Sequence, residues 1–352
     1  MKKLRLPGVI LALCLVAAIV SGGGAAVTPP GTVVMSGLDN PRHLAFGPEG
    51  GLYVAEAGRG GSGPCFVRRN ETLCAGHSGA VSRLWHGVQV RLVTGLPSYA
   101  NAAGNGAIGA HAVSLHGRGG AYATVGLGGE TIPPTQFRDM MGEGFGRTIR
   151  FKPNGSWHYV DDIAGYEEAN NPDGNVPDSN PYAILAQPGG RVVTDAGGND
   201  LLRVGANGDI STLAVFPARP GRSTDSVPTS VTVGPDGAYY VGELSGAPFN
   251  INDSHVYRVV PGQPPQTYGP TVSFIIDLAG GPDGHLYVLQ FASQPGNSGP
   301  GILYRLESNG TKTPVVTGLV APGGLAFGPD GALYVSNKSV LAGAGEVLRF
   351  EP

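Results

Sequence analysis

The sequence has 352 residues, including 59 Gly and 30 Pro, and only 14% of it is charged while 41% is hydrophobic. A chain so rich in turn-forming residues indicates many short strands and excludes a mainly helical fold. The formal net charge of −3 provides no basic surface field and argues against nucleic acid as a partner.

The first 26 residues have the pattern of a secretory signal peptide. Lys2, Lys3 and Arg5 precede an apolar run over residues 9–20, and small residues at 24–26 suit cleavage. The run is too short for a comfortable membrane span. We therefore expect a secreted protein, extracellular or periplasmic, without membrane attachment after cleavage, whose residues 27–352 form a single domain.

Two cysteines remain in the mature chain, Cys65 and Cys74. In an exported protein, a single close pair predicts a disulfide that closes a surface loop. Two thiols are too few for a zinc–cysteine site.

A strand–turn–strand phrase recurs six times along the chain. Four copies contain Gly-Pro-Asp-Gly or Gly-Pro-Glu-Gly, in which Pro presets its own φ and Gly accepts a positive φ. Pro188, Pro235, Pro282 and Pro329 follow one another at a constant period of 47 residues. The six copies span residues 44–55, 113–124, 184–195, 231–242, 278–289 and 325–336.

A third strand follows each phrase and is marked by an arginine before an apolar residue, and a fourth strand comes next. Four strands per repeat predict an all-β, six-bladed β-propeller. Residues 32–38 resemble residues 313–319, so the N-terminal strand is expected to complete the last blade. We expect the marker arginines to pair with acidic or carbonyl groups between blades: Arg83, Arg150, Arg203, Arg258, Arg305 and Arg349.

The turns within the phrases are short and define a bottom face, whereas the insertions collect on the opposite, top face. The top face carries the loop between the cysteines, residues 126–146 and the crossing over residues 161–180. Long loops on a rigid scaffold are where binding and catalysis usually occur.

Aligning the repeats places polar residues at the top-facing strand ends, around the central channel. His43 and His111 are candidate catalytic residues because imidazole serves as a general base near neutral pH. The candidate ligand-binding residues are Arg42, Glu56, Asp178, Asn180, Tyr182, Asp195, Asn199, Glu243 and Asp277. A wet propeller channel would also need a polar lining without any ligand.

Two places suit a divalent cation with oxygen ligands, such as Ca2+. Glu56, Asp195 and Glu243 are the candidate metal ligands at the strand ends. The crossing over residues 170–180 is rich in Asn and Asp and offers a second place for calcium, although such residues are also ordinary turn formers.

Several phrases of the mature chain resemble the ScyD/ScyE family of exported propeller proteins. They occupy residues 38–42, 55–65, 125–129, 178–182, 195–202 and 241–246. The resemblance implies an exported six-bladed propeller and brings no settled activity. The sequence departs from the family pattern at Ala112 and Phe274, where members tend to carry Asp and Asn.

Three functions are compatible with these patterns. The first is binding of a small molecule in the top-face channel by a monomeric protein. The second is a divalent-metal-dependent lactonase or lyase activity, and the third is a protein-interaction platform built from the top loops. The Gly-, Asn- and acid-rich loops favour a ligand pocket over a flat interface.

Overall fold

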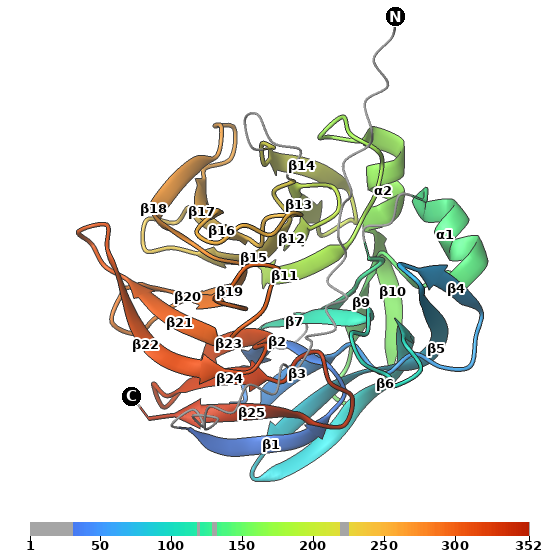
Figure 1. Ribbon diagram of the computed structural model, residues 1–352, viewed down its shortest axis with the longest axis horizontal. Coiled ribbons are helices and arrows are strands. Elements are labelled where there is room, and N and C mark those ends of the chain that lie inside the picture. Colours follow the sequence, from blue (N-terminus) through green and yellow to red (C-terminus); the bar gives the residue numbers. More distant parts are fainter. Residues whose placement is uncertain (1–30, 118–119, 129–131, 219–224, 352) are drawn as a thin grey trace, which may run out of the picture.

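The computed structural model describes residues 31–117, 120–128, 132–218 and 225–351, so the predicted signal peptide lies outside the described residues. The described residues form six antiparallel sheets arranged around one axis (Figure 1). The predicted six-bladed β-propeller is thereby confirmed.

Each blade has four main strands, which follow one another from the axis outward. Blade 1 contains β2 (Pro41–Phe46), β3 (Leu52–Glu56), β5 (Glu71–Trp85) and β6 (Val88–Ala100), with β4 (Cys65–Arg68) added beside β5. Blade 2 contains β7 (Ala110–His116), β8 (Gly120–Val125), β9 (Arg147–Phe151) and β10 (Trp157–Asp162). Blade 3 contains β11 (Pro181–Gln187), β12 (Gly190–Asp195), β13 (Asp200–Gly205) and β14 (Ile210–Val215).

The remaining blades follow the same order. Blade 4 contains β15 (Pro228–Val233), β16 (Tyr239–Glu243), β17 (Ser254–Val259) and β18 (Gln266–Val272). Blade 5 contains β19 (Ile275–Gly280), β20 (Leu286–Gln290), β21 (Gly301–Leu306) and β22 (Lys312–Leu319). Blade 6 contains β23 (Gly324–Phe327), β24 (Leu333–Asn337), β25 (Gly345–Phe350) and β1 (Thr32–Leu38).

The ring closes through the pairing of the two ends of the described chain. β1 lies antiparallel to β25, with Met35 opposite Val347. Met35 and Leu38 are buried in a cluster that joins blades 6 and 1. The predicted closure by the N-terminal strand is confirmed, and it covers the edge of β25 that would otherwise be open.

The marker arginines stabilise individual blades. In blade 4, Arg258 Nε donates to Asp236 at 2.6 Å, and Tyr240 Oη donates to the same carboxylate at 3.4 Å. Blades 5 and 6 repeat this contact of turn aspartate, second-strand tyrosine and third-strand arginine. The expectation that these arginines bridge neighbouring blades is therefore wrong for these three blades, because the short turn brings its own aspartate beside the third strand.

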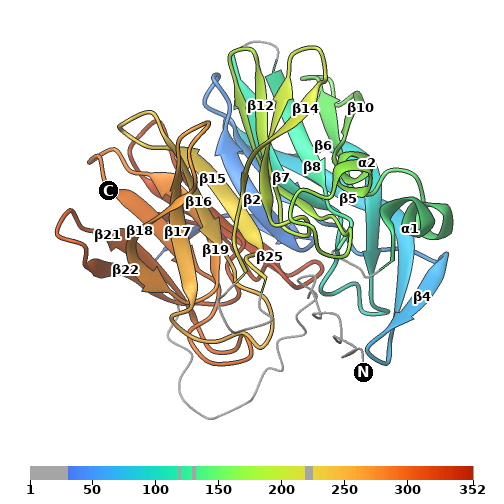
Figure 2. The ribbon, with the colours of Figure 1, turned by 90° about the horizontal axis from the view of Figure 1, so that it is seen from above.

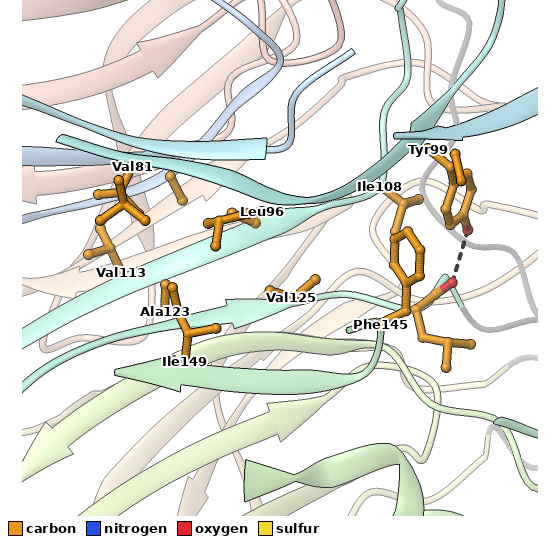
Figure 3. Close-up of a cluster of buried hydrophobic side chains, with 14 of the residues drawn as sticks. Val81, Leu96, Tyr99, Ile108, Val113, Ala123, Val125, Phe145 and Ile149 are labelled. Carbon is orange, nitrogen blue, oxygen red and sulfur yellow. Dashed lines mark hydrogen bonds between the residues drawn. The ribbon is translucent and has the colours of Figure 1, made fainter. Parts of the chain in front are cut away.

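Apolar side chains fill the space between neighbouring sheets. Between blades 1 and 2, Val81 and Leu96 pack towards Val113, Ala123 and the residues around them (Figure 3). Alternating residues of each strand face this cluster, as expected for sheets that pack face to face.

One buried ion pair joins blades 2 and 3. Arg191 of β12 donates from Nε to Asp161 of β10 at 2.6 Å, and a second guanidinium nitrogen contacts the other carboxylate oxygen. The two side chains are 6% and 0% exposed. Thr148 also donates to Asp161, and the Arg191 guanidinium lies over the Tyr122 ring.

The top-face insertions contain more regular structure than the sequence indicated. Helices α1 (Pro134–Met141) and α2 (Ile163–Asn170) occupy stretches that we expected to be loops, and they lie with β4 at one edge of the molecule (Figure 2). Phe137 and Met141 of α1 are buried in the core between blades 1 and 2. The predicted Cys65–Cys74 disulfide is present, and it links β4 to β5. None of the helices described is long and apolar enough to cross a membrane.

Candidate functional site

Four inner strands carry polar side chains near their starts, on the top side of the channel. The pairing of each strand with its neighbour shifts register there, in β2, β7, β11 and β19. A residue at such a bulge is not part of the regular hydrogen-bonded pairing of the two strands. Its side chain therefore points in a different direction from that of a regularly paired residue. The residues at or beside these shifts are named the central cluster: Arg42, His43, His111, Tyr182 and Asp277.

His43 of blade 1 contacts residues at the start of β19 in blade 5. His43 Nε2 lies 3.2 Å from the carbonyl oxygen of Ile276, and its Nδ1 lies 3.8 Å from Asp277 Oδ1. Asp277 also accepts bonds from the main-chain N–H groups of Leu278 and Leu325, each at 2.8 Å. Burial raises the pKa of Asp277, and the neighbouring His43 opposes that rise.

His111 and Tyr182 lie against each other, with ring centroids 4.6 Å apart. His111 Nδ1 donates to the carbonyl oxygen of Pro181 at 3.3 Å, which leaves Nε2 with the lone pair of the neutral ring. His111 Nε2 and Tyr182 Oη are both buried and lack hydrogen-bond partners in the part of the chain that the structure describes. Burial and the nearby charge of Arg42 hold the pKa of His111 well below its ordinary value, while burial raises the pKa of Tyr182 to about 12.

Arg42 is fully buried, which is rare for a guanidinium without a carboxylate partner. Its Nη2 donates to the carbonyl oxygen of Ala107 at 2.8 Å. Its Nε and Nη1 have no partner among the described residues. Three neighbouring blades thus contribute free polar atoms to the cluster. Arg42 and Tyr182 provide free donors, and His111 Nε2 provides a free acceptor.

We expect His111 to stay neutral at pH values where a free histidine is protonated. The pKa of His111 lies below that of an unfolded histidine, which is about 6.5. Arg42 and His43 are the charged or titratable groups that oppose its protonation. Its ring C2–H signal in an NMR titration should therefore not move between pH 8 and pH 6.

The same shift has a defined effect on stability. Below about pH 6.5 His111 is protonated in the unfolded chain but stays neutral in the folded chain. Proton binding therefore favours the unfolded chain, and the free energy of unfolding decreases as the pH falls. The difference in unfolding free energy between wild type and His111→Gln should consequently decrease from pH 7 to pH 5. A difference that stays constant with pH would contradict the assignment.

The three predicted metal ligands each end the second strand of a different blade, and the structure does not bring them together. Glu56 accepts from the N–H of Asp39 at 2.6 Å and from Arg91 at 2.9 Å. Asp195 accepts from the N–H of Asn180 at 2.6 Å and from two further N–H groups. Glu243 accepts from Ser226 Oγ and from His255.

These carboxylates hold the crossing before their own blade against its second strand. Gln290 and Asn337 do the same in blades 5 and 6 by accepting from Ser273 and Val320. Within the described ranges, no group of three or more His, Cys, Asp or Glu side chains is placed so that it could hold a metal ion. The repeated position therefore has a structural role in five blades.

Two predicted ligand-binding amides also have structural partners. Asn180 Oδ1 accepts from the N–H of Gly128 at 3.1 Å. Asn199 Oδ1 accepts from the N–H of Val227 at 3.0 Å, and its Nδ2 donates to Asp173 at 2.9 Å. Asp178 lies beside the turn between β12 and β13, where its Oδ1 is 2.6 Å from the position that a Cβ on Gly197 would occupy.

A groove of about 680 Å³ opens on the bottom face between blades 1 and 2. Its lining includes Pro48, Tyr53, Trp85, Phe151 and Pro153. This lining is mainly apolar, and Glu49, Tyr53 and Arg83 are the blade 1 counterparts of the contact that recurs in blades 4 to 6. The central cluster differs from this groove in that three almost completely buried residues carry polar atoms without partners among the described residues, which makes it the candidate site.

Comparisons with known proteins establish the fold. No family model matches the sequence, and no curated protein is significantly similar to it. Among solved structures, a glucose dehydrogenase is similar over 91% of this chain and 99% of its own, at 17% identity and a TM-score of 0.54. A candidate oxidoreductase (glucose dehydrogenase) from Thermus thermophilus is similar over 92% and 99%, at 20% identity and a TM-score of 0.55. A candidate gluconolactonase is similar over 92% of both chains, at 13% identity and a TM-score of 0.50.

Proposed function

We propose that this chain is an exported, monomeric propeller of the ScyD/ScyE type that binds a small molecule with a carboxylate or carbonyl group in the top-face channel. The observation that carries the proposal is the set of free polar atoms on Arg42, Tyr182 and His111. Buried polar groups are normally hydrogen-bonded, and a ligand would satisfy all three. The Cys65–Cys74 disulfide supports an oxidising compartment and hence export.

Each free group has a distinct role towards such a ligand. The free Nε–H and Nη1–H groups of Arg42 point to different edges of the guanidinium plane, so each would donate to a different oxygen of the ligand. Tyr182 would donate from its neutral hydroxyl, since its pKa is about 12. His111 Nε2 would accept from a hydroxyl or an N–H group of the ligand.

The second candidate function is a lactonase or lyase activity at the same site. A neutral imidazole with a free Nε2 favours it, because such a nitrogen can take a proton from water or from a carbon beside a carbonyl group. Arg42 and Tyr182 would then stabilise negative charge on the carbonyl oxygen. The structure gives no support to a metal-dependent form, since Glu56, Asp195 and Glu243 each bond to the crossing before their own blade.

Tyr182→Phe tests the proposal with little risk to the fold. The substitution removes a buried hydroxyl without a hydrogen-bond partner, so the free energy of unfolding should stay the same or rise, by at most about 1–3 kcal/mol. Thermal unfolding against a panel of small hydroxy acids, lactones and aromatic carboxylates should reveal ligands that raise the Tm of wild type. The same ligands should raise the Tm of Tyr182→Phe much less.

Tyr99→Phe is the matched control. Tyr99 is equally buried, but its hydroxyl donates to the carbonyl oxygen of Leu127 at 3.0 Å. Its removal should lower stability by about 1 kcal/mol and leave ligand shifts intact. Equal ligand shifts in wild type and Tyr182→Phe would refute binding at the central cluster. A ligand consumed by wild type but not by His111→Gln would favour the enzymatic alternative.

A further inference from the structure

The bottom-face groove between blades 1 and 2 combines an aromatic lining with the volume of a ligand site. Its volume of about 680 Å³ is typical of clefts that hold small molecules. Tyr53 of blade 1 and Phe151 of blade 2 both line it, and their ring centroids lie 6.2 Å apart. Trp85, which also lines the groove, is 39% exposed. Both blades therefore offer rings against which a flat aromatic ligand can pack.

The charged side chains of the same lining are mostly positive. Arg83, Arg150 and Lys152 line the groove together with a single carboxylate, that of Glu49. The whole chain, in contrast, has a formal net charge of −3. A cleft lined by one sign of charge raises the local concentration of ligands of the opposite sign. The groove is therefore complementary to an anion, although the protein as a whole is acidic.

The excess positive charge comes from blade 2. In blade 1, Glu49 Oε1 accepts from Tyr53 Oη at 2.7 Å, and Arg83 lies opposite Tyr53 on the neighbouring strand and over the Trp85 ring at 5.1 Å. The turn of blade 2, residues 117–120, contains no Asp or Glu in its sequence. Blade 2 thus adds the positive charges of its third strand and the turn after it without a turn carboxylate to oppose them.

The corresponding groove between blades 4 and 5 lacks this positive charge. It has a volume of about 360 Å³, and Tyr240, Tyr268 and Leu306 belong to its lining. As far as the structure describes that lining, it includes neither Arg nor Lys. Arg258 of blade 4 instead donates to its turn carboxylate, Asp236, at 2.6 Å. The basic lining is therefore specific to the groove between blades 1 and 2 and does not follow from the repeat itself.

We propose that this groove binds an aromatic molecule that carries an acidic group, such as a carboxylate or a sulfonate. The ring of the ligand packs against Tyr53, Phe151 and Trp85. Its acidic group lies beside Arg150 and Lys152, since guanidinium and ammonium groups form charge-assisted hydrogen bonds with oxyanions. The site is on the face opposite the central cluster, and it does not rest on the function proposed there.

Two fluorescent probes with the same rings test the proposal. 1-Anilinonaphthalene-8-sulfonate is an anion, whereas N-phenyl-1-naphthylamine is uncharged. The mature protein should bind the sulfonate about tenfold more tightly at low ionic strength, and added NaCl should weaken only the sulfonate complex. The chain has two tryptophans, so in Trp157→Phe the sulfonate should quench the fluorescence of Trp85 alone. Equal affinities for the two probes, or no binding of the sulfonate, overturn the proposal.

Arg150→Gln/Lys152→Gln removes two positive charges from the groove. Both residues are exposed, so the substitutions should leave the fold intact. Binding of the sulfonate should weaken about fivefold, and binding of the uncharged probe should not change. Arg203→Gln/Lys338→Gln is the matched control, because it removes the same charge from residues that do not line the groove. Its affinity for the sulfonate should equal that of wild type.

The same affinity for the sulfonate in the groove variant and in wild type overturns the proposal, as does equal weakening in the two double variants. If the groove variant does not fold, Lys152→Gln is compared with Lys338→Gln in the same way. Tyr182→Phe should bind the sulfonate as wild type does. Weaker binding in Tyr182→Phe would place the probe in the central cluster and overturn the groove as its site, so the two proposals fail on different variants.

Discussion

Asp161→Asn should lower the free energy of unfolding by about 3–5 kcal/mol. The substitution leaves the Arg191 guanidinium buried between blades 2 and 3 without its carboxylate. It also weakens the bond from Thr148, which donates to the same carboxylate. Urea unfolding followed by tryptophan fluorescence would measure the loss.

An exposed pair of the same chemistry supplies the control. Asp330 and Arg349 approach to 2.9 Å, but their side chains are 42% and 25% exposed. Exposed ion pairs contribute about 0–1 kcal/mol, so Asp330→Asn should change stability little. Similar losses in Asp161→Asn and Asp330→Asn would show that burial is not what makes the interblade pair important. Replacing Asp161 and Arg191 together by Leu and Met should recover part of the lost stability.

Leu38→Ala in the closing strand should cost about 2–5 kcal/mol. Leu38 is completely buried in the cluster that joins blades 6 and 1, so the substitution leaves a cavity at the closure of the ring. Deleting residues 31–38 should have a larger effect, because it removes β1 and exposes the edge of β25. The deleted protein should aggregate, which size-exclusion chromatography with light scattering would detect.

Val33→Ala is the control within the same strand. Val33 is 51% exposed, so its truncation should change the unfolding free energy by less than about 0.5 kcal/mol. If the two substitutions in β1 had equal effects, closure through burial of Leu38 would be wrong. A deletion variant that stayed monomeric and stable would argue that the ring does not depend on β1.

The repeat made the blade architecture predictable from sequence. The Gly-Pro-Asp-Gly turn and the third-strand arginine recur because they contact each other, so their period reports one structural unit. The helices were not predictable in the same way. Helices of eight residues are marginal by themselves, and α1 depends on the burial of Phe137 and Met141 against distant strands.

The candidate site was predictable in part. Aligning the inner strands selected every member of the central cluster, because their starts share one height along the axis. The same alignment misjudged Glu56, Asp195 and Glu243, since a strand end can turn towards the crossing as well as towards the channel. The spacing of Glu167 and Asp178 along the chain did not indicate that both reach the turn at Gly197 and Gly198, which only the fold brings about.

Because β1 pairs with β25, the last blade can form only near the end of synthesis of the described chain. β1 is among the first segments of the described chain to be made, and its partner, which ends at Phe350, is among the last. The ribosome must therefore complete five blades before the sixth can form, and the contact with the longest sequence separation comes at the end. Until then β1 remains an unpaired strand, exposed to other chains. Partial products should accordingly be the species that most need protection from aggregation.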